Sequence, residues 1–151
     1  MSLLIRSVAD KAQSKEIQFK KWQTAVVASN ASARIQIIRI GANANVLVSA
    51  SEYFNMPRAK FAQILGMSPA TAERKIRHGS LLGHFESERL ARIAIIEAEV
   101  EAVFGDENRA KAWLLQKNLA LGDTPLSMLD TETGAAEVRK ILSAIAYGGV
   151  V

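Results

Sequence analysis

The chain has 151 residues and a net charge of +4, a length suited to one domain or to two small ones that share a core. Hydrophobic residues make up 49% and charged residues 23%, which excludes an intrinsically disordered chain. Aromatic residues account for only 6%, and this scarcity favours helices over strands. The sequence contains no cysteine, which excludes disulfide bonds and thiolate metal sites.

Residues 1–34 are polar and rich in alanine and serine. Their apolar stretch is interrupted by Arg6 and Asp10, unlike the apolar core of a signal peptide. No segment of the sequence approaches the roughly 20 apolar residues that cross a bilayer. We therefore expect a soluble, cytoplasmic protein. Residues 1–34 are expected to form a mobile arm that can hold a helix, from which Phe19 and Trp22 can pack on the body of the protein.

The next segment, residues 35–40 (IQIIRI), both alternates and clusters its apolar residues. Its periodicity therefore fits a strand as well as a helix. Gly41 ends the segment, and a helix is expected to begin near Asn43 or Asn45.

Two short helices joined by a turn are predicted in the middle of the chain. Pro57 suits the first turn of one helix, and Gly66 ends it. Ser68 can then cap a second helix that begins with Pro69. Glycine in the turn allows a left-handed backbone, and the small side chain of Ala62 lets the two helices approach closely. This pattern predicts a helix-turn-helix, whose second helix reads DNA.

Positive charge is concentrated in this motif. Five basic residues stand against one acidic residue between Arg58 and Arg77, a balance that attracts a phosphate backbone. If Ala72 and Ile76 face inward, Arg74 points outward and can pair with guanine. The predicted DNA-binding residues are Arg58, Lys60, Ser68, Ala70, Thr71, Arg74, Lys75 and Arg77. An alanine-rich helical hairpin that binds no DNA would show the same pattern, and this alternative stays open.

A long helix is expected from Glu86 to Phe104, because apolar residues recur there at helical spacing and Gly105 follows as a stop. Its apolar surface exceeds what a small monomer easily buries. Operators read by helix-turn-helix proteins also consist of paired half-sites. We therefore expect a homodimer with this helix or its neighbours in the interface.

The last part of the chain predicts a compact helical unit. Asp106 can cap one helix, and Thr124-Pro125 can begin a short helical turn. A final helix follows residues 130–133. Its apolar stripe at i, i+3, i+4 and i+7 is formed by Val138, Ile141, Leu142 and Ile145.

Together these elements predict an all-α protein of three parts: an arm (1–34), a helix-turn-helix domain with its following helix (35–104), and a C-terminal domain (105–151). No Ser/His/Asp set, paired-carboxylate motif or phosphate loop stands out. His78 and His84 have no third metal ligand nearby. We therefore expect neither an enzyme nor a cofactor or metal site.

The segment from Val103 onward resembles the toxin-binding domain of the Xre/MbcA/ParS antitoxin family. The resemblance is carried by Val103-Phe104-Gly105-Asp106, Ala112-Trp113-Leu114, Asn118, Ala120-Leu121-Gly122, Thr124-Pro125-Leu126, Leu129-Asp130-Thr131, Gly134-Ala135, Glu137-Val138, the stripe from Leu142 to Ile145, and Tyr147-Gly148. It extends back to about Gly41, where the family carries an Xre/Cro-like helix-turn-helix. Asp123 departs from the pattern, since many relatives have a second glycine there.

The resemblance implies the antitoxin of a type II toxin–antitoxin system. The implied partner is a RES-domain toxin that depletes NAD. The antitoxin would occlude the NAD site of the toxin, and its helix-turn-helix would repress the promoter of the pair. The implied partners are thus the cognate toxin and operator DNA, with a homodimer inside a hetero-oligomeric complex and no membrane.

For contact with the toxin we expect the end of the last helix and the tail. These residues are Arg139, Lys140, Ile145, Tyr147, Gly148, Gly149, Val150 and Val151. A second interpretation stays open, in which the chain is a stand-alone transcriptional regulator and its C-terminal domain only mediates dimerisation. A toxin gene beside its own, or a toxin that co-purifies with it, would distinguish the two.

Overall fold

A computed structural model describes residues 18–148 of the chain. Within these residues the protein is helical and has no β-strand, which confirms the all-α prediction. After a first helical segment, residues 18–28, the helices are α2 (Ala31–Ile40), α3 (Ala44–Tyr53), α4 (Arg58–Ile64), α5 (Pro69–His78), α6 (His84–Phe104), α7 (Glu107–Leu115), the 3-10 helix η1 (Ser127–Asp130) and α8 (Glu132–Ala146). None of the described helices is both long and apolar enough to span a bilayer.

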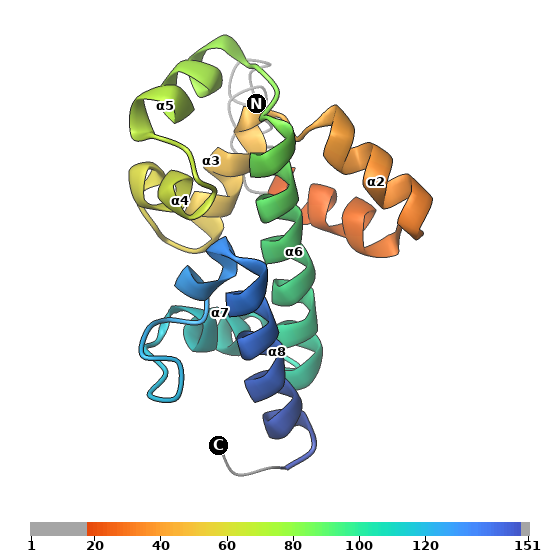
Figure 1. Cartoon of the computed structure of the whole chain (residues 1–151), viewed down its shortest axis with the longest axis vertical. Helices are drawn as coiled ribbons and strands as arrows, with labels where there is room; N and C mark the ends of the chain where they lie inside the picture. Colours follow the sequence, from red (N-terminus) through yellow and green to blue (C-terminus); the bar gives the residue numbers. More distant parts are fainter. Residues whose placement is uncertain (1–17, 149–151) are drawn as a thin grey trace, which may run out of the picture.

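The long helix α6 runs through the middle of the molecule (Figure 1), with α3, α4 and α5 beside its first half and α7 and α8 beside its second half. It packs against α2, α7, α8 and η1. Its apolar residues Leu90, Ile93, Ile96 and Val100 are fully buried by the chain itself. Other helices of the same chain already cover this apolar surface, so it no longer supports a dimer interface on α6, and an interface on the neighbouring helices stays a prediction.

The described part of the expected arm is a packed helix. Phe19 is fully buried, and its ring lies 5.3 Å from that of Tyr53 and 5.9 Å from that of Phe54, measured between centroids. The arm therefore covers at most the residues before 18, which lie outside the described residues. The amphipathic pattern of this segment is weak because it buries polar side chains, such as Gln23, along with apolar ones.

Residues 35–40, for which the sequence allowed a strand or a helix, belong to α2. The side chain of Asn30 caps this helix by accepting a hydrogen bond of 2.8 Å from the backbone N–H of Ala33. Arg34 donates from Nε to the carbonyl oxygen of Val26 over 3.0 Å, which ties α2 to the end of the preceding helix. No residue of α2 is buried, and Ile40 is 66% exposed.

Helix α7 begins at the predicted cap, Asp106, and α8 begins within the predicted lead-in, residues 130–133. The side chain of Asp106 accepts a hydrogen bond from the backbone N–H of Asn108 at the start of α7, and that of Thr131 accepts one from Gly134 at the start of α8. A Cβ atom at Gly134 would collide with the carbonyl oxygen of Met128, so only glycine lets α8 pack this closely on η1. Most of the predicted stripe of α8 is buried.

Candidate DNA-binding and toxin-binding surfaces

The predicted helix-turn-helix consists of α4, a tight turn and α5. Gly66 in the turn has a φ of +78°, a conformation that glycine adopts without steric cost. Ala62 is fully buried between the two helices. The hydroxyl of Ser68 accepts a hydrogen bond of 3.2 Å from the backbone N–H of Thr71 and donates one of 2.9 Å to the Thr71 hydroxyl. These contacts fix the first turn of α5.

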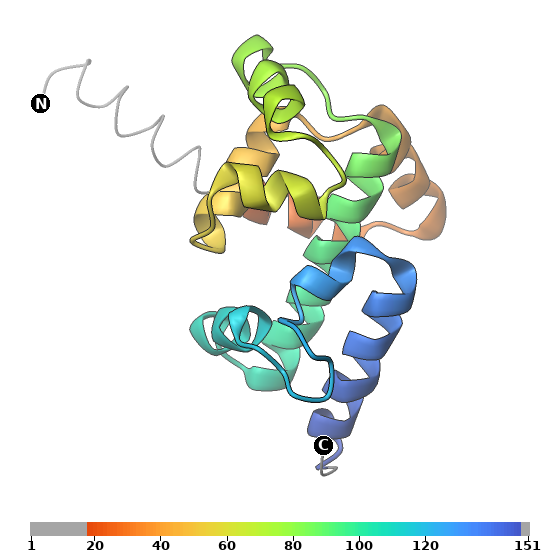
Figure 2. The same ribbon diagram turned by 60° about the vertical axis from the view of Figure 1, so that its left-hand side comes forward.

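Helix α5 presents one face to the protein and one to solvent at the periphery of the molecule (Figure 2). Ala72 is buried and Ile76 half-buried, so they face inward. Arg74 and Arg77 are exposed, and neither forms an ion pair with any residue that the structure describes. Both guanidinium groups are therefore available to an external anion. At the start of the helix, Ala70 is exposed.

Two other predicted DNA-binding residues have partners within the chain, and a third lines a cleft. Arg58 pairs with Glu73 over 3.6 Å, and Lys75 donates from Nζ to the carbonyl oxygen of Leu81 over 3.2 Å. Lys60 lines a cleft of about 440 Å³ between α4 and the segment that leads into η1, which also holds Asp123 and Asp130. Lys60 thus faces the C-terminal domain as well as solvent, an arrangement that no local sequence pattern indicates.

A buried carboxylate joins the first helical segment to α6. Glu97 is fully buried, and its Oε1 accepts hydrogen bonds of 2.8 Å from Lys20 Nζ and 3.1 Å from Gln23 Nε2. Lys20 also binds Glu101 over 2.7 Å. Burial raises the pKa of Glu97 to about 7, and the ammonium of Lys20 opposes this rise only in part. The cluster connects residues that are 77 positions apart in the sequence.

This buried carboxyl gives the protein a pH-dependent stability. Between about pH 4.5 and 7 the folded chain holds a proton at Glu97 that the unfolded chain has lost, because the pKa of an unburied glutamate is 4.5. The free energy of unfolding should therefore fall as the pH rises through about 7, by about 1–3 kcal/mol in total. Urea denaturation at several pH values measures it. The hydrogen bond with Glu97 and the charge of Lys20 lower the pKa of Glu101, so Glu101 titrates below this window.

Glu97→Gln should flatten this pH dependence, whereas Glu52→Gln, at an exposed position, should preserve it. Both variants retain the two histidines, so the difference between them isolates Glu97. Equal slopes for Glu97→Gln and the unaltered chain would show that Glu97 does not titrate in this range.

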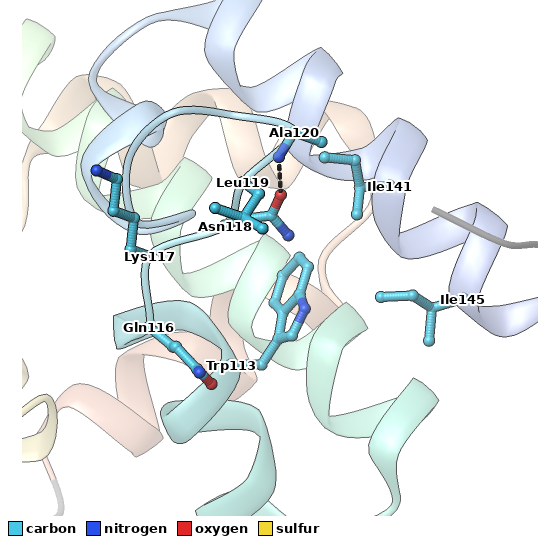
Figure 3. Close-up of a pocket in the computed structure, with 8 residues that line it drawn as sticks. All are labelled: Trp113, Gln116, Lys117, Asn118, Leu119, Ala120, Ile141 and Ile145. Carbon is cyan, nitrogen blue, oxygen red and sulfur yellow. Dashed lines mark hydrogen bonds between the residues drawn. The ribbon is translucent and has the colours of Figure 1, made fainter.

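The C-terminal domain has a groove between α7 and α8 with a volume of about 290 Å³. Figure 3 shows Trp113 of α7 facing Ile141 and Ile145 of α8 across it. The ring of Trp113 also lies 6.0 Å from that of Phe104, between centroids, which supports it from behind. The loop after α7 closes one side of the groove with Lys117, Asn118, Leu119 and Ala120.

This loop is held by its own hydrogen bonds. Asn118 Oδ1 accepts from the backbone N–H groups of Ala120 and Leu121 over 2.9 and 3.3 Å, and the first of these bonds is drawn in Figure 3. The backbone N–H of Asn118 donates to the carbonyl oxygen of Asp123 over 3.0 Å. The same loop leaves Leu119 95% exposed. Leu119 was not among the surface residues predicted from the sequence. The local signal for its exposure is the preceding asparagine, a residue typical of such turns.

The structure places the predicted toxin-binding residues of α8 in different settings. Arg139 is held against α6 by Glu99, with Nε and Nη2 at 3.1 and 3.3 Å from its carboxylate oxygens. Lys140 is exposed, with Glu137 at 3.8 Å. Ile145 lines the groove.

The end of α8 is open to solvent. Tyr147 is 91% exposed, and Gly148 follows with a φ of +72°. The remaining predicted tail residues, Gly149, Val150 and Val151, lie outside the described residues.

Comparison with known proteins identifies both regions. A family model described as the antitoxin Xre/MbcA/ParS C-terminal toxin-binding domain matches residues 99–148, and one described as the antitoxin Xre-like helix-turn-helix domain matches residues 33–94. Antitoxin Xre of Yersinia enterocolitica is 29% identical over 123 residues, which cover 80% of this chain and 83% of that protein.

Two further relatives carry the same name. Antitoxin Xre of Pseudomonas putida is 42% identical over 79 residues, covering 52% of this chain and 50% of that protein. Antitoxin Xre of Photorhabdus laumondii is 25% identical over 130 residues, covering 84% of this chain and 88% of that protein. The first match ends at residue 94 and the second begins at residue 99, both within α6, and together they span most of the sequence. The chain therefore belongs to the Xre/MbcA/ParS antitoxin family, with an Xre-like helix-turn-helix domain followed by a C-terminal toxin-binding domain.

Proposed function

We propose that the chain is the antitoxin of a RES–Xre type II pair, which neutralises an NAD-depleting RES-domain toxin and represses its own operon. The observation that carries the proposal is that one continuous helix, α6, joins a domain matched as a helix-turn-helix to a domain matched as toxin-binding. Helix α5 and the end of α8 lie at opposite ends of the molecule (Figure 1). DNA and toxin can therefore be bound at the same time.

Neutralisation is proposed to occur by occlusion of the NAD site. Small-molecule sites are concave and mostly apolar with a few polar groups, and Tyr147 offers a flat apolar ring with one hydroxyl. Tyr147 is almost fully exposed, at the end of a helix whose buried face rests on other residues. Gly148 and Gly149 allow the chain to turn into a narrow opening. The tail would block the substrate without any catalytic group of its own.

Repression is proposed to depend on α5, with Arg74 and Thr71 reading bases and Arg77 and Lys75 contacting phosphates. Two copies would bind the paired half-sites of an operator, and the antitoxin would form this homodimer inside the complex with the toxin. We locate the activity in the cytoplasm, where operator DNA and NAD are both found.

Two variants of α5 should distinguish the contribution of base contacts to operator binding from that of phosphate contacts. Arg74→Ala should cost about 1–3 kcal/mol at the specific operator and little on random DNA. Arg77→Ala should weaken binding to all sequences alike and reduce the salt dependence. Fluorescence anisotropy with an operator duplex and a scrambled duplex at several salt concentrations measures both effects. Lys21→Ala, an exposed lysine outside the motif, serves as the control.

Full operator affinity in the Arg74→Ala, Arg77→Ala double variant would rule out α5 as the reading helix.

The proposal as a whole is tested by co-expressing the chain with the toxin gene adjacent to its own. Growth and NAD content should both recover when the chain is present. Recovery of neither would reject the antitoxin function in favour of a stand-alone regulator.

A further inference from the structure

An apolar side chain is held in solvent beside the groove of the C-terminal domain. Leu119 is 95% exposed, although the loop that carries it is fixed by the hydrogen bonds of Asn118. A leucine in a flexible loop can fold back onto apolar surface, but this one is restrained from doing so. With Trp113, Ile141 and Ile145 it forms a continuous apolar site, which we name the Leu119 site.

We propose that the Leu119 site anchors the toxin, separately from the tail. This inference rests on the proposed function and adds a second contact to it. All residues of the site lie within residues 99–148, which match a toxin-binding domain. Its shape, an apolar knob beside a groove, fits a complementary apolar side chain on the toxin, and such buried apolar anchors dominate the affinity of protein interfaces.

The charge of the Leu119 site indicates which kinds of residue on the toxin would contact it. Lys117 is the one charged side chain among the described residues that line the groove. The other lining groups are the amides of Gln116 and Asn118 and apolar side chains. The complementary segment of the toxin is therefore an apolar residue flanked by a carboxylate, which would pair with Lys117 at the polar rim.

The Leu119 site and the tail have different roles in neutralisation. The Leu119 site supplies affinity, because it buries apolar surface without reaching the reacting atoms. The tail supplies inhibition, because it excludes NAD. Loss of the first raises the antitoxin concentration that is needed for inhibition, whereas loss of the second lowers the inhibition reached at saturation.

The test compares variants of the full chain with the purified partner toxin, by calorimetric titration for affinity and by NAD consumption for inhibition. Leu119→Asp should weaken toxin affinity by about thirtyfold or more and still inhibit fully at saturation. Lys117→Glu should weaken it by about tenfold. The matched control is Ile40→Asp, at an exposed apolar position on α2 outside the toxin-binding domain, and its affinity should be unchanged. A chain without residues 147–151 should still bind but inhibit poorly.

Each alternative outcome has a distinct meaning. Unchanged toxin affinity for Leu119→Asp overturns the Leu119 site, whatever the tail does. If Leu119→Asp instead changes the mass of the antitoxin alone in sedimentation, the site joins two copies of this chain and the proposal is also overturned. Tight binding without inhibition by the unaltered chain refutes occlusion while leaving the Leu119 site supported by its affinity data. Absence of any binding by the unaltered chain overturns both.

Discussion

A chain that lacks Tyr147 to Val151 is expected to bind the toxin and leave it active. At saturating antitoxin, NAD consumption should be roughly tenfold or more above that with the full chain, because an interface beside an open active site does not exclude substrate. The fold should persist, since α8 is held by Val138 and Leu142, which are buried. The measurement is NAD consumption by the partner toxin, titrated with the full and the shortened chain.

The control for this truncation is that the fold and operator binding of the shortened chain are unchanged. Thermal unfolding and operator affinity of the shortened chain should match those of the full chain, because α5 is distant from the end of α8 (Figure 1). Equal inhibition by the two chains would show that the tail does not block the site. Occlusion would then have to come from the faces of α7 and α8.

Phe19→Ala is expected to destabilise the protein strongly, by about 3–5 kcal/mol. The ring is fully buried and contacts Tyr53 and Phe54, so its removal leaves a cavity between the first helical segment and α3. Urea denaturation at a single pH measures the loss. Val27→Ala, in the same segment but 42% exposed, should change the unfolding free energy by less than about 0.5 kcal/mol.

This comparison decides whether the first helical segment belongs to the core. Wild-type stability of Phe19→Ala would mean that the segment behaves as the detachable arm suggested by its composition. A large loss confined to Phe19 would show that the helix-turn-helix domain depends on residues before its matched range, which begins at residue 33.

Local signals were sufficient to predict much of the fold. The caps at Ser68 and Asp106 and the turn at Gly66 were each indicated by neighbours within a few residues, because capping and turn conformation are determined locally. The apolar spacing of α6 and α8 predicted which faces are buried. The outward position of Arg74 and Arg77, which we propose bind DNA, followed from the same local geometry.

Long-range pairing could not be predicted from the sequence. Lys20 contacts Glu97 across 77 positions, and Arg139 contacts Glu99 across 40, so neither pair leaves a periodic trace. Long-range packing also explains why the apolar surface of α6 suggested a dimer interface. The helices of the same chain that cover this surface cannot be identified from the sequence. Leu119 was missed for a different reason, since a single exposed leucine in a turn differs from a buried one only in three dimensions.

The most direct measurement of the central claim is the rate of NAD consumption by the purified partner toxin, titrated with the full chain at several NAD concentrations. If the chain occludes the NAD site, the rate falls towards zero at saturation and higher NAD shifts the inhibition curve to higher antitoxin concentrations. A toxin that consumes NAD at its full rate with the antitoxin in excess would contradict neutralisation, and inhibition that is independent of NAD concentration would contradict occlusion.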